Sequence, residues 1–472
     1  MRRFISAVLL AAAVVPPGGP AAAAAAPLAI TRESQRDLMV TIYNGNLGLV
    51  KDTREARLPA GMSEVQFADV AAQIDPTSVH LKSLTDPAGL RILEQNYEYD
   101  LLSAQKLLEK YVGKKVRLYQ GNGTYLEATL LSTDGPVFDI NGAIHMGHQG
   151  QIVFPALPEN LVSKPTLLWL LRNAATAPQR VEASYLTGGI TWKSDYVVIL
   201  NAADDRADLT GWVTIDNKSG ATYTDAALKL VAGDLNRARE DRGAQRVNEM
   251  ALKAAAAAPA SRDFVSEGFF EYHLYTLDGR TTIKDKQTKQ LTLMSAANVP
   301  VRKELAFFGA RDYYRSQYGT PVSNQKVSVF VELSNSKANN LGVPLPKGKI
   351  RVYKADKSGS QQLVGEDWID HTPKDERVRI KMGEAFDVVG ERTQRDWKKI
   401  GGSTYEVEWE ISLRNHKKED VVVSVIEPIP GDWEVVRETQ AHEKIEAHTL
   451  RYQVPVPQEG SAKVTYRVRL RF

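Results

Sequence analysis

The stretch LMVTIYNGNLGLV, residues 38–50, decides the fold class of this 472-residue chain. Two runs rich in β-branched and aromatic residues stand on either side of Asn44 and Gly45. An Asn-Gly pair between such runs is the strongest short-range signal for a tight β-hairpin, because both residues accept the positive φ angles of the turn. We therefore expect a hairpin here, and short extended segments between residues 65 and 84 continue the β pattern.

One short helix is predicted after these strands. Ser103 can cap its first turn and Gly113 can end it. Apolar side chains recur between them at the spacing of one helical face: Ala104, Leu107, Leu108 and Tyr111. We interpret this face as core packing.

The rest of the chain divides into β blocks of two kinds. Residues 114–154 contain about five very short strands separated by Gly-rich turns, which is typical of a small SH3-like barrel. Residues 161–235 and 327–472 contain longer alternating runs, which are typical of sandwich sheets. An Arg-, Glu- and Ala-rich excursion at 236–262 interrupts them and is expected to be partly helical.

The predicted class is therefore mainly β, with two Ig-like β-sandwich blocks, a small SH3-like barrel inserted near the N-terminus and one partly helical excursion. The predicted domains are a signal peptide at 1–26, an N-terminal β segment with one short helix at 27–111, the small barrel at 112–156, a first sandwich block at 157–310 and a C-terminal sandwich at 311–472.

A weak internal echo links the two sandwich blocks. Asn217 ends one alternating run and is followed 17 positions later by Asp234, and Asn415 is followed by Asp432 at the same distance. A third run ends at Asn335. We favour a hairpin of the same length in two sandwich domains over a shared ligand site.

The first 26 residues have the features of an export signal. Arg2 and Arg3 precede a short apolar run, and small residues suited to cleavage follow. We expect an exported protein of the periplasm or cell envelope, or a secreted one. The chain has no cysteine, so neither disulfides nor a lipidated cysteine are expected to hold it in place.

Composition narrows the classes of partner. The chain has 60 basic and 57 acidic residues and a net charge of +3, which argues against nucleic acid and anionic membrane surfaces as partners. After the signal, no apolar run approaches the roughly 20 residues of a membrane-spanning helix. Gly-x-Ser-x-Gly, phosphate-loop and dinucleotide motifs are missing from the sequence, so no cofactor is expected.

The densest polar segment is EDWIDHTPKDE, residues 366–376, with Asp370, His371, Asp375 and Glu376 as candidate catalytic residues. An imidazole flanked by carboxylates can act as a general base, and the carboxylates could hold a hard cation. The same residues also favour a turn, because Asp and Thr side chains form hydrogen bonds with nearby backbone groups. We favour the turn and keep the site as an alternative.

His145 and His148 are candidate metal ligands, because neutral imidazoles bind transition metals well. Residues at i and i+3 of a strand project to opposite faces, so only a turn at Gly147 could bring both rings together. A surface loop is the simpler interpretation.

Five long segments resemble an uncharacterised family of exported bacterial proteins called domain of unknown function 4139. They are LPENLVSKPTLLWLL (157–171), GGITWKSDYVVILN (188–201), DLTGWVTIDNKSGATYTDAALKLVAGD (208–234), GVPLPKGKIRVYKAD (342–356) and GEDWIDHTPKDERVRIKMGEAFDVVGER (365–392). The resemblance implies a β-rich envelope protein. It carries no established activity or catalytic residues.

We therefore expect a non-enzymatic protein that binds or scaffolds in the envelope, with an envelope protein or glycan as its partner. One alternative is an envelope hydrolase or metal-assisted enzyme that uses residues 366–376. Another is an outer-membrane β-barrel, because the last strand alternates and ends on Phe472 as terminal barrel strands do. A closing sandwich strand explains that alternation more simply.

Overall fold

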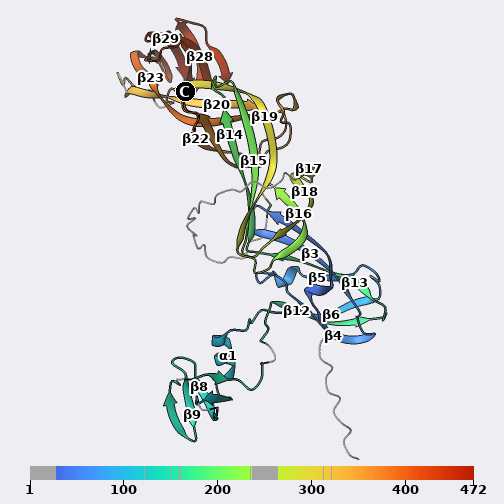
Figure 1. Cartoon of the computed structure of the whole chain (residues 1–472). Helices are drawn as coiled ribbons and strands as arrows, with labels where there is room; N and C mark the ends of the chain where they lie inside the picture. The colour runs from blue at the N-terminus through green and yellow to red at the C-terminus, as the bar shows by residue number, and fades with distance from the viewer. Residues whose placement is uncertain are drawn as a thin grey trace, which may run out of the picture. The chain divides into compact units, whose positions relative to one another are not determined.

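The computed structural model describes residues 28–121, 123–148, 150–158, 161–233, 235–236, 264–311, 313–319 and 322–472. The predicted signal peptide at 1–26 lies outside these ranges, as does the excursion at 236–262 apart from Asn236. The described chain is mainly β, which confirms the predicted fold class (Figure 1). Its helices, of which α1 is the longest with 8 residues, are all too short and too polar to serve as membrane spans.

The chain forms two compact units, and each is described by itself. The first contains residues up to 34 together with 54–70 and 82–181. The second contains 35–53, 71–81 and 182–472. The domain boundaries predicted at residues 111, 156 and 310 stay predictions.

The first unit holds two sheets and the α-helix. Its elements are β1 (Leu28–Ile30), η1 (Arg32–Ser34), β4 (Gly61–Ala68), β6 (Leu90–Glu98), α1 (Ala104–Tyr111), β7 (Lys115–Tyr119), β8 (Tyr125–Ser132), β9 (Val137–Ile140), β10 (Ala143–Met146), β11 (Ile152–Val153) and β12 (Thr166–Asn173). The sheet orders are β1-β4-β12-β6 and β10-β9-β8-β7-β11.

Helix α1 packs on the five-stranded sheet as the sequence predicts. The Ser103 hydroxyl accepts a hydrogen bond from the Lys106 backbone N–H at 3.1 Å and so caps the first turn. Tyr111 is buried in one cluster with side chains of the sheet, among them Leu118 and Phe138. The five predicted short strands are present, but the edge strands β10 and β11 are not paired with each other in the described residues, so the predicted barrel is an open sheet. Strand β11 has only two residues, both paired with β7.

The second unit holds the remaining strands, three of which (β3, β5 and β13) continue into residues of the first unit. Its elements are β2 (Gln35–Tyr43), β3 (Leu47–Ala56), η2 (Pro76–Ser78), β5 (His80–Ser83), β13 (Gln179–Thr187), β14 (Ile190–Leu200), β15 (Arg206–Asn217), β16 (Tyr223–Ala232), β17 (Phe264–Phe269), β18 (Tyr272–Ile283), β19 (Gln287–Phe308), β20 (Val322–Ser334), η3 (Lys337–Asn339), β21 (Gly348–Ala355), β22 (Gln361–Ile369), β23 (Arg377–Gly401), β24 (Thr404–Asn415), β25 (Val421–Pro428), β26 (Asp432–Glu438), β27 (Glu443–Glu446), β28 (Thr449–Val456) and β29 (Ser461–Arg471).

These strands form two large sheets. One has the order β17-β18-β16-β2-β3-β13-β5, and the adjacent β2 and β3 confirm the hairpin predicted around Asn44. The predicted turn geometry is wrong, because the positive φ of the turn is at Asn46 and not at Asn44 and Gly45. The other runs β22-β21-β14-β15-β19-β20-β23-β24-β29-β26, with β25, β27 and β28 attached outside this path. No sheet of the described chain closes on itself.

Strands β19 and β23 are long enough to serve two cores, with 22 and 25 residues (Figure 1). The middle core contains buried side chains of β14, β15, β19–β21 and β23, for example Tyr196, Leu209, Val331, Ile350 and Ile380. The C-terminal core contains others from β19, β20, β23–β25, β28 and β29, for example Phe307, Val388, Trp409, Tyr452 and Tyr466. The two cores are therefore joined by continuous backbone.

Buried asparagines stand at the ends of strands in this unit, at Asn217, Asn335 and Asn415. Each amide nitrogen donates to backbone carbonyls of two segments: Asn217 to Ala221 and Ile283, Asn335 to Val343 and Pro373, and Asn415 to Glu419 and Val456. The hairpin that we favoured at the two echoed positions is wrong, because in the described chain β15 and β16 lie in different sheets, and β24 and β25 are not paired with each other. What the positions share is that each amide joins turns. Asp234 lies outside the described residues.

A buried ion pair crosses the C-terminal core. The Arg392 guanidinium donates to Glu427 at 3.1 and 2.9 Å, and the two side chains are 3% and 0% exposed. Arg392 also donates to the Tyr314 hydroxyl at 3.2 Å and stacks 3.4 Å above the Trp409 ring. Burial works against its charged form, but the Glu427 carboxylate outweighs this and raises the pKa of Arg392.

We predict that Arg392→Met destabilises the C-terminal core strongly, because it leaves the Glu427 carboxylate buried and unpaired. Removing one partner of a buried pair costs about 3–5 kcal/mol. Urea unfolding followed by tryptophan fluorescence measures this loss. Arg414→Met, which breaks a partly exposed pair with Glu391, is the control and should cost less than about 1 kcal/mol. Equal losses in the two variants would contradict the prediction.

Candidate functional site

The acidic segment 366–376 begins in β22, and its second half, residues 370–376, forms a turn held by backbone bonds. Thr372 and Leu345 exchange two N–H···O bonds of 2.9 Å, and the Asp375 N–H donates to the Asn335 carbonyl at 2.7 Å. Asp375 has a φ of 68°, which suits a turn.

The four candidate catalytic residues sit on this turn in different settings. Asp370, Asp375 and Glu376 are exposed, and His371 is half-buried. The His371 Nδ1 accepts a hydrogen bond from the Lys347 backbone N–H at 3.2 Å, and the Asp375 carboxylate lies 3.8 Å from the Lys374 ammonium. These contacts support the turn. A catalytic role for the segment stays a prediction.

The two candidate metal ligands lie on and after the edge strand β10. His145 is exposed and stands opposite Phe138 of β9 in the sheet register. The His148 Nε2 lies 3.0 Å from the Tyr119 carbonyl oxygen. No group of three or more His, Asp or Glu side chains with the geometry of a metal site occurs in the described part of the chain.

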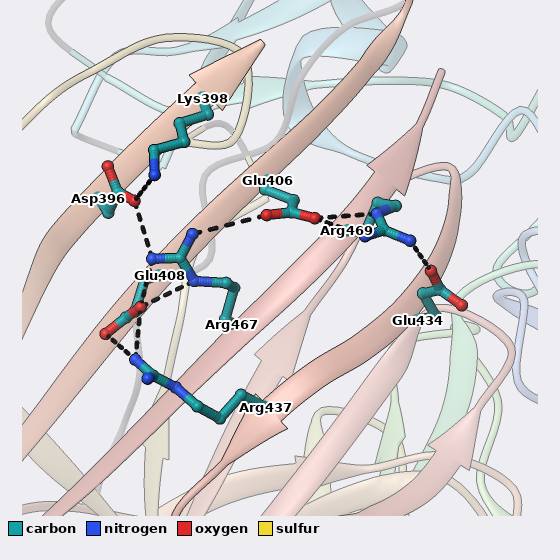
Figure 2. Close-up of polar contacts among 8 residues, drawn as sticks. All are labelled: Asp396, Lys398, Glu406, Glu408, Glu434, Arg437, Arg467 and Arg469. Atoms are coloured by element: carbon teal, nitrogen blue, oxygen red, sulfur yellow. Dashed lines mark hydrogen bonds and ion pairs between the residues drawn. The ribbon is translucent and has the colours of Figure 1, made fainter. Parts of the chain in front are cut away.

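Charged side chains from β23, β24, β29 and β26 form a connected network of ion pairs (Figure 2). We call this set the charge ladder, and it consists of Asp396, Lys398, Glu406, Glu408, Glu434, Arg437, Arg467 and Arg469. Alternation places its members in β24, because Val407 and Trp409 face the C-terminal core while Glu406 and Glu408 face outward. In β26 a register shift between Val435 and Arg437 brings Arg437 opposite Arg467.

The ladder alternates in charge across the sheet. Lys398, Glu406, Arg469 and Glu434 are successive cross-strand neighbours, and Arg469 donates to both acids at 2.7 Å. Arg467 donates to Glu408 at 2.6 Å and to Asp396 at 2.8 Å (Figure 2). Its four acids and four bases balance, so the ladder satisfies its own charges and stabilises the sheet.

A pocket of about 300 Å³ opens at one end of the middle core. Apolar side chains and a glycine form its floor and walls, namely Leu200, Val329, Val331, Val364, Met382 and Gly383. Charged side chains complete it at Asp204, Lys303, Lys354 and Glu384, and we call them the rim. We call this site the mouth pocket. An apolar cavity with a few convergent polar groups is the usual form of a small-molecule site.

Two β-bulges shape the mouth pocket. Val364 is the extra residue of β22 where the register with β21 shifts, and Met382 is the extra residue of β23 where the register with β20 shifts. Gly383, at a φ of 137°, follows Met382. Bulges re-aim side chains at the rims of β structures and beside functional sites. Both extra side chains line the pocket.

The rim is organised around one carboxylate. Lys303 and Lys354 donate to the two oxygens of Asp204 at 2.8 and 2.5 Å. Burial works to raise the pKa of Asp204, but the hydrogen bonds and charges of the two lysines outweigh it, and the pKa is lowered. Asp204 is therefore ionised at neutral pH.

A second hollow, of about 560 Å³, occurs in the first unit and is lined by Arg57, Leu58, Pro59, Thr176 and Ala177. Arg57 is its single ionisable group, so fewer polar groups converge there than at the mouth pocket. The mouth pocket is the better candidate.

Motif reasoning from the sequence did not find the mouth pocket. Asp204 is 99 positions from Lys303 and 150 positions from Lys354, and no short motif spans such distances. The only local signal is the polar turn after Leu200, in which the Asn201 side chain accepts from the Asp205 N–H at 3.2 Å.

We predict that Asp396→Asn lowers the stability of the C-terminal sheet near neutral pH but not in acid. The hydrogen bond from Arg467 lowers the pKa of Asp396 below its ordinary 3.8. Its stabilising effect is therefore present above that ordinary value and is lost as the pH falls through the lower, folded-state value.

Thermal unfolding of both proteins from about pH 7 down to about pH 2 tests this, since the gap in Tm should close in acid. Asp278→Asn, at an exposed position of β18, is the matched control and should show no such closure. A gap that stays constant with pH would contradict the prediction.

Two comparisons with known proteins test the family resemblance seen in the sequence. A search of curated proteins finds no match to the chain. The family model described as Domain of unknown function (DUF4139) matches residues 181–472, which include the mouth pocket, the charge ladder and both cores. This match covers more than half of the chain and confirms the predicted family. The chain therefore belongs to the family described as Domain of unknown function (DUF4139).

Proposed function

We propose that this protein is exported to the cell envelope and acts there by binding, without turnover, with the mouth pocket as its ligand site. The observation that carries the proposal is the combination of an apolar floor, two bulged side chains and a charged rim in one pocket of about 300 Å³. Pockets that bind small molecules start at about this size.

The chemistry of the lining favours binding over catalysis. Among the described residues, no Ser, Thr, Cys or His lines the mouth pocket, so the lining presents no hydroxyl or thiol nucleophile and no imidazole base. Its two carboxylates are engaged, since Asp204 pairs with two lysines and Glu384 lies 3.0 Å from Lys381. A carboxylate with a lowered pKa is a weak general base, because an efficient base has a pKa near the operating pH.

Export rests on the N-terminal signal pattern in residues 1–26, and the β-sandwich plan without cysteine suits an envelope protein. The partner that we propose outside the pocket is an envelope protein or glycan. Fractionation of cells with an antibody to the mature chain tests the location. Retention in the cytoplasm with the leader intact would overturn it.

Filling the mouth pocket should abolish ligand binding. We predict that the purified protein binds the uncharged fluorescent probe N-phenyl-1-naphthylamine and that Met382→Trp weakens this binding at least about tenfold, equivalent to about 1.4 kcal/mol. Val364→Trp fills the pocket from the other bulge, where the side chain is 41% exposed, and should do the same if Met382→Trp does not fold.

Met146→Trp is the matched control, because Met146 is 84% exposed on β10 and lies outside the pocket. Fluorescence titration measures the affinities, and circular dichroism checks that each variant keeps its sheets. Probe binding that survives both pocket variants would show that the mouth pocket is not the site.

A further inference from the structure

We infer that the mouth pocket takes a small organic anion, namely a carboxylic acid with one ionised head and a short apolar body. This inference rests on the proposed function, because it assumes that the pocket binds a ligand. It names the class of that ligand from the charge and size of the site.

The charged groups at the rim and their ion-pair partners carry one positive charge in excess. Three lysines (Lys303, Lys354 and Lys381) pair with two carboxylates (Asp204 and Glu384). Lys303 and Lys354 share the single carboxylate of Asp204. Glu384 does not supply the missing negative charge, because it has its own partners: the Lys381 ammonium at 3.0 Å and the Ser328 hydroxyl at 3.0 Å. An anionic head would balance the excess, and a cationic head would add to it.

Lys303 has hydrogen-bond donors to spare. An ammonium group has three N–H donors. Lys354 uses two acceptors, Asp204 and the Ala202 carbonyl, at 2.5 and 3.0 Å. Within the described chain Lys303 has one acceptor, Asp204, and its side chain is 37% exposed. A ligand carboxylate could therefore accept from Lys303 without breaking the bonds of the rim.

Size limits the apolar body. The cavity of about 300 Å³ holds on the order of ten water-sized groups at about 30 Å³ each. That volume suits a medium-chain or small aromatic acid and is too small for a two-chain lipid. Leu200, Val331 and Met382 offer the apolar contact that such a body needs.

Competition against N-phenyl-1-naphthylamine on the full mature chain tests the inference. The competitors are octanoate, 1-octanol and octylammonium, which share one apolar tail and differ in the charge of the head. Octanoate should displace the probe at a concentration at least about tenfold below that of octanol, and octylammonium should be the weakest.

Lys303→Met should remove the advantage of octanoate over octanol, because it keeps the length of the stem and removes the charge. The two competitors are compared within the same variant, so the readout is the ratio of their affinities and not the affinity of the probe. Lys357→Met, in an exposed turn outside the pocket, is the control and should keep the advantage.

The outcomes separate this inference from the proposed function. If the probe binds in the pocket but octanol competes as well as octanoate, or if Lys303→Met keeps the advantage, the anion inference is overturned while the binding function stands. If the probe does not bind, or binds equally to the pocket-filling variants, the proposed function fails and the inference fails with it.

Discussion

The structure of the second unit depends on two strands that each serve two cores. Strand β19 packs Val299 into the middle core and Phe307 into the C-terminal core. Strand β23 does the same with Ile380 and Val388. A strand alternates its side chains with period two, so a continuous strand between two sandwiches must keep or reset its phase where it passes from one core to the next. Register in both cores is therefore coupled through the same backbone.

The mouth pocket lies beside one of the register shifts in these strands. Strand β23 resets its pairing with β20 at a bulge, and the extra residue is Met382. Strand β22 has a bulge at Val364 against β21. The extra residues that shift the register of these two strands, Met382 and Val364, therefore also line the mouth pocket.

Charge is distributed by the same alternation. In β24 the inward residues include Trp409, on which Arg392 stacks, and the outward residues include Glu408, which belongs to the charge ladder. In the C-terminal core, Arg392 pairs with Glu427. On the outer face of the sheet, the charge ladder has as many acidic as basic side chains. The rim of the mouth pocket is different. Lys303 and Lys354 converge on Asp204, and Glu384 is paired with Lys381, so three lysines pair with two carboxylates. An unbalanced charge beside an apolar cavity is a feature of ligand sites more than of packing.

The sequence by itself determined what depends on neighbours along the chain. The Asn-Gly turn after Tyr43, the cap at Ser103 and the period-two alternation of the last strand all predicted elements that the structure contains. The sequence also identified the candidate catalytic residues at 366–376, because they are adjacent along the chain. Only the tertiary structure placed Asp204 beside Lys303 and Lys354, since strand register brings together positions 99 and 150 residues apart. Local sequence patterns predict which segments form strands and which face of each strand is buried. A pocket depends on which distant strands become neighbours and in what register.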